Sequence, residues 1–338
     1  MLVPIDFNKV EIAKGVFYGG DAGAKEAIIY DDGVWMLKYP KTARDMRNPQ
    51  ISYTTSSLSE YLGSKIYETL GIPVHETLLG IRNNKVVTAC KDFTRAWSKK
   101  IALYDTDRVL NSTEDGEGLP LYAPGVWQEK YLVPFHDLKN SFMSSDLESY
   151  SGTGSETLLD EVLATIAGQS ELKTIPGALE RFWDMFVIDA FIDNNDRNNG
   201  NWGILIDPKN NAVDLAPVYD NGNAFFNKRS LAQMTKRLND ENAMQEDAYK
   251  TLLCAYKYTG LDNEGQKINP FTFIKHGENS DCLAAVLRFV NTVDMNVIKN
   301  IIYDIPESVG NLAVMPEVQK EFYLKLMQVR LEILQTNN

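Results

Sequence analysis

The stretch FIDNNDRNNGNWGILI, residues 191–206, decides how this sequence is interpreted. It contains five asparagines together with Asp193, Asp196 and Arg197, and it interrupts an otherwise apolar part of the chain. Residues 177–190 are apolar almost all round and predict a buried helix, whereas residues 201–207 predict a strand. A polar segment at this point is either a surface turn or a binding site, and the spacing of its side chains must decide.

The spacing excludes a calcium-binding EF-hand loop. Such a loop needs oxygen ligands at alternate positions, a glycine at the sixth position and a glutamate at the twelfth. Counting from Asp193, the fifth position is Arg197, the sixth is Asn198 and the twelfth is Ile204. A calcium loop of this kind therefore cannot form here.

The same segment fits phosphoryl transfer, which needs a carboxylate near the attacking hydroxyl and oxygen ligands for magnesium on the nucleotide phosphates. Asp196 is followed five residues later by Asn201, the spacing of a kinase catalytic loop. Asp220, in APVYDNG, follows the next predicted hairpin and precedes a glycine. Carboxylates near a helix C-terminus are electrostatically unfavourable, and a catalytic use accounts for Asp193 and Asp196 at that place.

The N-terminal residues contain the other parts that this chemistry needs, a flexible glycine-containing turn and a lysine on the next strand. In YGGDAGAKEAIIYDDGVWMLKYP, residues 18–40, three glycines form the turn and Lys38 lies within an apolar strand. Position alone leaves open whether Lys38 points outward or is held for a partner. Glu60, in the following predicted helix, is its natural ion-pair partner. Because Glu60 lies two residues off the apolar stripe of that helix, a solvated glutamate is the alternative.

Composition sets the broad class. The chain has 338 residues and a net charge of −12, which argues against a general nucleic-acid binder because such proteins carry a basic face. The three cysteines (Cys90, Cys254 and Cys282) stand far apart in apolar contexts, which predicts buried free thiols and no local zinc site. Neither a signal peptide nor a membrane-spanning run is evident, so we expect a soluble cytoplasmic protein without direct nucleic-acid or membrane binding.

The secondary-structure pattern predicts an α+β protein of two lobes. Residues 1–93 predict a small β-rich lobe with one helix, in which DDG and RNN mark hairpin turns. Residues 94–338 predict a larger helical lobe that contains the asparagine-rich loop and the hairpin after it. The Ser- and Gly-rich segment 146–157 is the best candidate for a mobile loop.

Five stretches now identify a family. SYTTSSLSEYLGSKIYETLGIPVHETLLG, VVTACKDF, FWDMFVIDAFIDNNDRNNGNWGIL, LAPVYDNG and DCLAAVLRFVNTVDMNVI, spread in order from residue 52 to about 298, resemble the HipA-like serine/threonine kinases, and most closely their small CtkA-type members. The resemblance implies a two-lobed kinase-like fold with ATP in the cleft between the lobes, Mg²⁺ on its phosphates, and a protein substrate with a Ser or Thr acceptor.

The resemblance also implies roles for individual residues. Asp196 would be the catalytic carboxylate, Arg197 would neutralise charge beside it, and Lys38 would contact the α- and β-phosphates, paired with Glu60. Asn201 and Asp220 would hold magnesium. The remaining nucleotide-binding positions form two groups, the phosphate turn (Gly19, Gly20, Asp21, Ala22, Gly23, Ala24 and Lys25) and the hinge beside adenine (Lys91, Asp92 and Phe93).

The chain departs from the family in three ways. Larger HipA toxins are autophosphorylated on a serine of the phosphate loop, but GGDAGAKEA contains no Ser or Thr, which puts that mode of self-inactivation in doubt. The toxins carry an additional N-terminal domain used with an antitoxin, whereas this sequence begins about 18 residues before its phosphate turn, so an antitoxin partner is also in doubt. It ends at EILQTNN and lacks the basic tail of some small relatives.

Two other functions stay open at this level. Related folds phosphorylate a small molecule or a lipid hydroxyl, and the phosphate-binding residues alone do not choose the acceptor. A non-catalytic ATP-binding interaction module is the third hypothesis. We expect an active, autophosphorylating protein kinase, because the sequence keeps all three polar side chains of the reaction, Asp196, Asn201 and Asp220.

Overall fold

The N-terminal lobe is a five-stranded sheet whose hairpins are fixed by their turns. Asp31 and Asp32 have φ of 44° and 55°, and Asn83 and Asn84 have φ of 51° and 55°, the left-handed values that two-residue hairpin turns require. Both predicted hairpins are thus confirmed. The strands, in the spatial order β1-β4-β5-β3-β2, are β1 (Ile5–Asp6), β2 (Lys25–Tyr30), β3 (Gly33–Lys38), β4 (Thr77–Arg82) and β5 (Lys85–Lys91).

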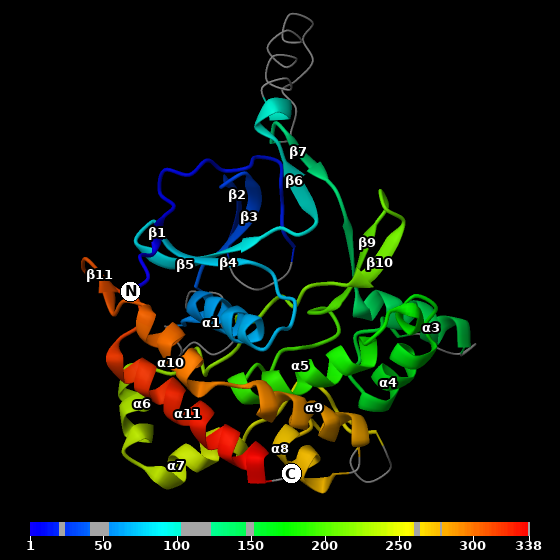
Figure 1. Cartoon of the computed structure of the whole chain (residues 1–338), viewed down its shortest axis with the longest axis vertical. Helices are drawn as coiled ribbons and strands as arrows, with labels where there is room; N and C mark the ends of the chain where they lie inside the picture. The colour runs from blue at the N-terminus through cyan, green and yellow to red at the C-terminus, as the bar shows by residue number, and fades with distance from the viewer. Residues whose placement is uncertain are drawn as a thin grey trace, which may run out of the picture.

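The computed structural model describes residues 1–19, 24–40, 54–102, 123–146, 152–259, 264–277 and 279–336. The sheet lies above the helices of the C-terminal part, with helix α1 (Ser56–Thr69) between them (Figure 1). Residues 147–151 of the predicted mobile loop, 146–157, lie outside the described residues. Every helix in the described part is too short or too polar to span a membrane.

Helix α1 is buried on nearly every side because it packs against both lobes. Its apolar stripe (Leu58, Leu62 and Ile66) is at most 1% exposed. On the sheet side, Ser57 Oγ donates to Val86 O at 2.9 Å and Thr88 Oγ1 donates to Ser57 O at 2.5 Å. On the other side, Ser59 Oγ donates to Ala224 O at 2.9 Å. Ser57 and Ser59 of this helix therefore bond to protein groups on opposite sides, the sheet and the C-terminal lobe.

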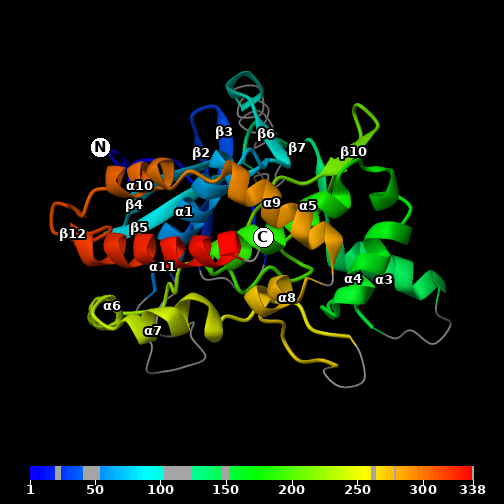
Figure 2. The same cartoon turned by 60° about the horizontal axis from the view of Figure 1, so that its bottom comes forward.

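The C-terminal part is mainly helical. In Figure 2, α11 lies below the strands with α6, α7 and α8 further down, and α10 lies at the level of the strands. Its helices are α3 (Phe135–Asp146), α4 (Leu159–Gly168), η3 (Leu172–Thr174), α5 (Ala178–Ile192), α6 (Leu231–Leu238), α7 (Glu241–Gln245), the π-helical turn η4 (Glu246–Lys250), α8 (Pro270–His276), α9 (Ser280–Thr292), α10 (Met295–Asp304) and α11 (Glu317–Thr336). Its strands are β6 (Arg95–Trp97), β7 (Val126–Gln128), β8 (Tyr131–Pro134), β9 (Gly203–Asp207), β10 (Ala212–Leu215), β11 (Ser308–Val309) and β12 (Leu312–Ala313).

Helix α5 forms the centre of the C-terminal part, as its all-round apolar sequence predicts. It contacts α4, α8, α9 and α11, and of its residues only Glu180 is exposed. Trp183 stacks on Phe273 with ring centroids 5.8 Å apart, and Trp202 stacks on Phe135 at 4.1 Å. Helix α5 ends at Asp193, whose φ of 63° turns the chain out of the helix. The polar segment therefore begins at a fixed point of the core.

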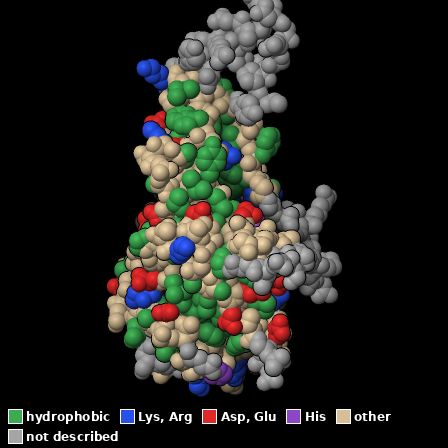
Figure 3. Space-filling view, turned by 90° about the vertical axis from the view of Figure 1, so that its right-hand side faces the viewer, with side chains coloured by type: hydrophobic (Ala, Val, Ile, Leu, Met, Phe, Trp, Pro, Cys, Tyr) green, Lys and Arg blue, Asp and Glu red, His purple; other side chains and the backbone are tan. Residues whose placement is uncertain are grey.

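The surface carries both signs of charge. On the face in Figure 3, Lys and Arg side chains are interspersed with Asp and Glu. The three cysteines are buried and free, as their apolar contexts predict.

Candidate active site

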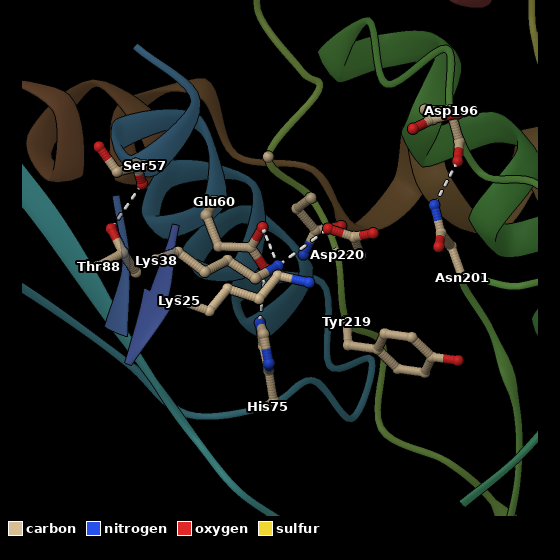
Figure 4. Close-up of polar contacts among 12 residues, drawn as sticks. Lys25, Lys38, Ser57, Glu60, His75, Thr88, Asp196, Asn201, Tyr219 and Asp220 are labelled. Carbon is tan, nitrogen blue, oxygen red and sulfur yellow. Dashed lines mark hydrogen bonds and ion pairs between the residues drawn. The ribbon is translucent and has the colours of Figure 1, made fainter. Parts of the chain in front are cut away.

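Strand register brings two lysines to the same place. Lys38, the last residue of β3, pairs with Lys25, the first residue of β2, and with Thr88 of β5. Directly opposed residues of an antiparallel pair project on the same face, so the two amino groups approach each other. Figure 4 shows both side chains extending towards Asp220. Two cations side by side are unfavourable unless anions face them, and here carboxylates do.

Lys38 is held by two carboxylates from distant parts of the chain. Its Nζ lies 2.8 Å from Glu60 Oε2 and 2.9 Å from Asp220 Oδ1. The residue is 8% exposed and Glu60 is fully buried, so the solvated alternatives for both side chains are excluded. Burial alone would lower the pKa of Lys38, but Asp220 and Glu60 raise it above its ordinary value. Lys38 is therefore a fixed cation at the junction of the lobes.

Two glycines allow helix α1 to approach the Asp220 turn closely. A Cβ on Gly63 would lie 2.7 Å from Asn221 Cβ, and a Cβ on Gly222 would lie 3.0 Å from Glu60 Oε2. Asp220 itself has φ of 61°, a left-handed conformation that Asp adopts more readily than most residues. The glycine of the DNG motif is thus explained by contact with Glu60.

The predicted catalytic loop places Asp196 at the surface. Asp196 is exposed. Asn201 Nδ2 donates to the carbonyl oxygen of Asp196 at 2.6 Å, and Asn198 Nδ2 lies 3.2 Å from Asp196 Oδ1 (Figure 4 draws the first contact). The side-chain nitrogen of Asn201 thus closes the loop by bonding to the backbone of Asp196. Asp196 and Asn201 lie across from Lys38, Glu60 and Asp220 in the same view.

Arg197 is buried in the C-terminal lobe, beside helix α5. It is 2% exposed, and its Nε lies 2.9 Å from Asp189 Oδ2 on α5. Its Nη1 donates to the carbonyl oxygens of Asn201 and Tyr219, and its Nη2 donates to Asn221 Oδ1 at 2.5 Å. The charge of Arg197 is therefore balanced by Asp189 inside the lobe. Its hydrogen bonds join the predicted catalytic loop to the Asp220 turn.

Sequence reasoning missed a line of buried polar residues that continues from Arg197 to Glu60. Asn221 Nδ2 donates to Ser64 Oγ at 3.1 Å, Ser64 Oγ lies 3.2 Å from His75 Nε2, and His75 Nε2 lies 3.0 Å from Glu60 Oε1. The asparagine of the DNG motif was the available signal, because a buried asparagine requires partners. Ser64 and His75 carry no local signal.

The residues assigned to the phosphate turn are described only at its ends. Gly20, Asp21, Ala22 and Gly23 lie outside the described residues. Lys25 Nζ donates to Gly19 O at 2.6 Å, and Tyr39 N donates to Ala24 O at 3.1 Å. The two ends of the turn are thus tied to each other and to the end of β3.

The residues assigned to the hinge follow β5 directly. Lys91 pairs with Glu76 at 2.8 Å, with both side chains about half exposed. Burial would raise the pKa of Asp92, but hydrogen bonds from Thr94, Arg95 and Tyr18 lower it below its ordinary value. The ring centroids of Phe93 and Tyr219 lie 6.0 Å apart, and Tyr219 is the residue directly before Asp220. The hinge segment thus meets the Asp220 segment through two aromatic rings.

The donor set fits magnesium. Mg²⁺ prefers oxygen ligands and usually binds one or two carboxylates together with substrate phosphates. Asp220 is a carboxylate with a 29% exposed side chain, of which only Oδ1 enters the ion pair with Lys38. Because Asn201 uses Nδ2 for the Asp196 carbonyl, its Oδ1 is the atom available for a cation. Both side chains therefore offer oxygen.

A sheet with one helix, placed over a helical lobe so that a buried lysine–glutamate pair meets a DNG turn, is the arrangement of protein-kinase-like enzymes. No protein-family model matches the chain. The serine/threonine-protein kinase CtkA of Helicobacter pylori is 32% identical over 327 residues, covering 96% of this chain and 85% of the relative. The chain belongs to the CtkA-type group of HipA-like serine/threonine kinases.

Solved structures agree with this membership. The crystal structure of a Helicobacter pylori proinflammatory kinase CtkA superposes with a TM-score of 0.76 and 29% identity, covering 99% of this chain and 98% of that one. HipA in the Shewanella oneidensis HipA–HipB–operator DNA complex matches with a TM-score of 0.52 and 12% identity, covering 98% of this chain and 67% of that chain. The second likeness concerns the fold alone. The kinase class and the two-lobed α+β fold expected from the sequence are thus confirmed.

Proposed function

We propose that this kinase transfers the γ-phosphoryl group of magnesium-bound ATP to a serine or threonine hydroxyl of a protein, including its own chain. The observation that carries the proposal is the contact of Lys38 with both Glu60 and Asp220, at 2.8 and 2.9 Å. The contact joins Lys38, which the proposal assigns to the phosphates, with Asp220, which it assigns to magnesium. The two residues are far apart in the sequence, so only the fold brings them together.

Each residue has a defined task in this proposal. Asp220 and Asn201 Oδ1 would hold magnesium, which when bound neutralises charge on the phosphates. Lys38 and Lys25 would bind phosphate oxygens from the sheet side. Asp196, exposed at the surface, would position the acceptor hydroxyl and accept its proton. Lys91, Asp92 and Phe93 would border the adenine.

The protein acceptor is proposed from the name of the CtkA relative, a serine/threonine-protein kinase. The phosphate-binding residues do not by themselves distinguish a protein hydroxyl from that of a small molecule or a lipid. An antitoxin-like partner is not part of the proposal. The HipA likeness, at 12% identity, concerns the fold alone.

The test is a transfer assay with γ-³²P-ATP and magnesium, using the full chain with and without a mixture of dephosphorylated proteins. Phosphoamino-acid analysis then identifies the acceptor. We expect phosphoserine or phosphothreonine that is lost in Asp196→Asn. Label on phosphotyrosine alone would contradict the proposed acceptor, as would label only on added small-molecule or lipid hydroxyls. ATP binding without transfer to any acceptor would contradict an active kinase.

A further inference from the structure

His75 lies on the side of Glu60 opposite to Lys38. It stands between α1 and β4, is 5% exposed, and places Nε2 3.0 Å from Glu60 Oε1 (Figure 4). Lys38 meets the other oxygen, Oε2, at 2.8 Å. Each oxygen of the Glu60 carboxylate thus has a nitrogen within 3.0 Å, and the two nitrogens come from different segments of the chain.

The His75 contact matters because the carboxylate is completely buried. Within the part of the chain that the structure describes, Glu60 Oε1 is buried without a hydrogen bond, and the His75 imidazole is the group at ion-pair distance from it. A buried carboxylate oxygen without a donor is costly, so loss of the imidazole would leave Glu60 free to rotate away from Lys38 or to bind a proton. Burial alone would raise the pKa of Glu60, but Lys38 and His75 hold it below its ordinary value.

The backbone around His75 is itself fixed to the segment that leads to Asp220. His75 N donates to Val218 O at 3.0 Å, and Val218 N donates to Pro73 O at 2.8 Å. Val218 precedes Asp220 by two residues. Ser64, one turn of α1 after Glu60, lies 3.2 Å from His75 Nε2 and accepts a hydrogen bond from Asn221. His75 is therefore placed by both the helix and the proposed metal-binding segment.

A metal ion is a second explanation for the same cluster. Glu60, His75 and Cys90 each offer a ligand atom, and these atoms lie within 4.8 Å of one another. Burial raises the pKa of the Cys90 thiol well above its ordinary value, so a metal would have to displace a tightly held proton. It would also compete with Lys38 for Glu60. The observed contacts favour the hydrogen-bonded arrangement.

We infer that His75 is a positioning residue of the active site, which holds the Glu60 carboxylate in the orientation that pairs with Lys38. This inference rests on the proposed function, in which Lys38 binds the nucleotide phosphates. It has a structural consequence. The Lys38–Glu60 pair is formed before nucleotide binds, and α1 is held to the Asp220 segment without any additional ordering event.

The test compares His75→Leu, which removes the donor, with His75→Gln, which retains an N–H donor on a side chain of similar reach. His276→Leu is the matched control, because His276 is exposed at the end of α8. Steady-state kcat and KM for Mg-ATP are measured with Lys38→Ala in parallel, and the melting temperature of each variant is recorded. Loss of one hydrogen bond to a charged group predicts a roughly 10- to 100-fold fall in kcat/KM for His75→Leu. We expect His75→Gln to recover most of that loss and His276→Leu to behave as the parent.

Two results would overturn the inference. One is a folded His75→Leu protein with parental kcat/KM. The other is equal impairment of His75→Leu and His75→Gln with equally lowered melting temperatures, which is the behaviour of a purely structural residue. Parental activity of Lys38→Ala would instead overturn the proposed function, so the two failures are distinguishable.

Discussion

The ammonium group of Lys38 lies 2.9 Å from Oδ1 of Asp220, although the two residues are 182 positions apart in the chain. The contact joins the last residue of a sheet strand to a turn of the other lobe. Since Glu60 binds the same ammonium group, the site has one cation between two carboxylates before any phosphate arrives. Several measurements follow from this arrangement.

Glu60→Gln should destabilise the protein far more than Glu76→Gln. Glu60 is fully buried against Lys38, whereas Glu76 pairs with Lys91 with both side chains about half exposed. Breaking a buried pair leaves a poorly compensated charge and costs about 3 kcal/mol, whereas an exposed pair contributes less than about 1 kcal/mol. Urea unfolding at neutral pH measures both changes. Equal losses for the two variants would show that burial does not control the strength of these pairs.

Asp220→Asn should remove the effect of magnesium on ATP binding. The change keeps the size of the side chain but removes the charge that would attract the cation. Asp214→Asn is the matched control, since Asp214 is exposed on β10 and is six residues earlier in the same segment. Calorimetric titration with ATP, with and without magnesium, is the measurement. Asp214→Asn should keep the magnesium-dependent gain in affinity, and a gain that also survives in Asp220→Asn would exclude the proposed ligand.

Gly63→Ala should be destabilising, against the intrinsic preference of its helix. Alanine favours a helix interior over glycine by about 1 kcal/mol. In α1, however, the new Cβ would lie 2.7 Å from Asn221 Cβ, so the helix or the DNG turn must shift. We expect a lower melting temperature together with a higher KM for ATP. A higher melting temperature would show that α1 and the turn can separate without cost.

Asp193 should make stability depend on pH in an unusual direction. Burial raises its pKa to about 6, even though Arg330 lies 3.5 Å away and opposes the rise. The folded protein binds the Asp193 proton more tightly than the unfolded chain does. The stability that this proton contributes is therefore fully present below the ordinary pKa of 3.8 and is lost as pH rises through about 6.

The measurement is the difference in unfolding free energy between the parent and Asp193→Asn. This difference should fall by on the order of 3 kcal/mol between about pH 4 and about pH 7. Taking a difference cancels the titration of all other carboxylates. A difference that stays constant or increases with pH would contradict the raised pKa.

The sequence predicts the elements of the site better than their contacts. The spacing of Asp196, Asn201 and Asp220 singles out three residues, because helix α5 and the hairpin after it are strongly patterned. The structure places Asp220 2.9 Å from Lys38 and the other two across from it (Figure 4). Both N-terminal hairpins are predicted by Asp and Asn residues at their turns, and the structure gives these residues positive φ. These features depend on short-range sequence alone.

The remaining parts depend on packing between segments far apart in sequence. Glu60 lies off the apolar stripe of α1. On a helix that packs through one face alone, a residue at that position would be exposed to solvent. Here Lys38, His75 and Gly222 surround the carboxylate, which is fully buried. Arg197 follows Asp196 directly in sequence, yet its side chain turns inward to Asp189. His75 meets Glu60 only because its backbone pairs with Val218. No local pattern carries this information.

The most direct test of the proposed mechanism is the effect of Asp196→Asn on binding and on turnover, measured separately in one preparation. Asp196 contributes no contact to Lys38 in the proposal, so affinity for Mg-ATP should stay at the parental value. Turnover should fall by roughly 10²–10⁴, the contribution of a positioned general base. Unchanged turnover, or loss of nucleotide binding together with turnover, would contradict the assignment of Asp196 as the catalytic carboxylate.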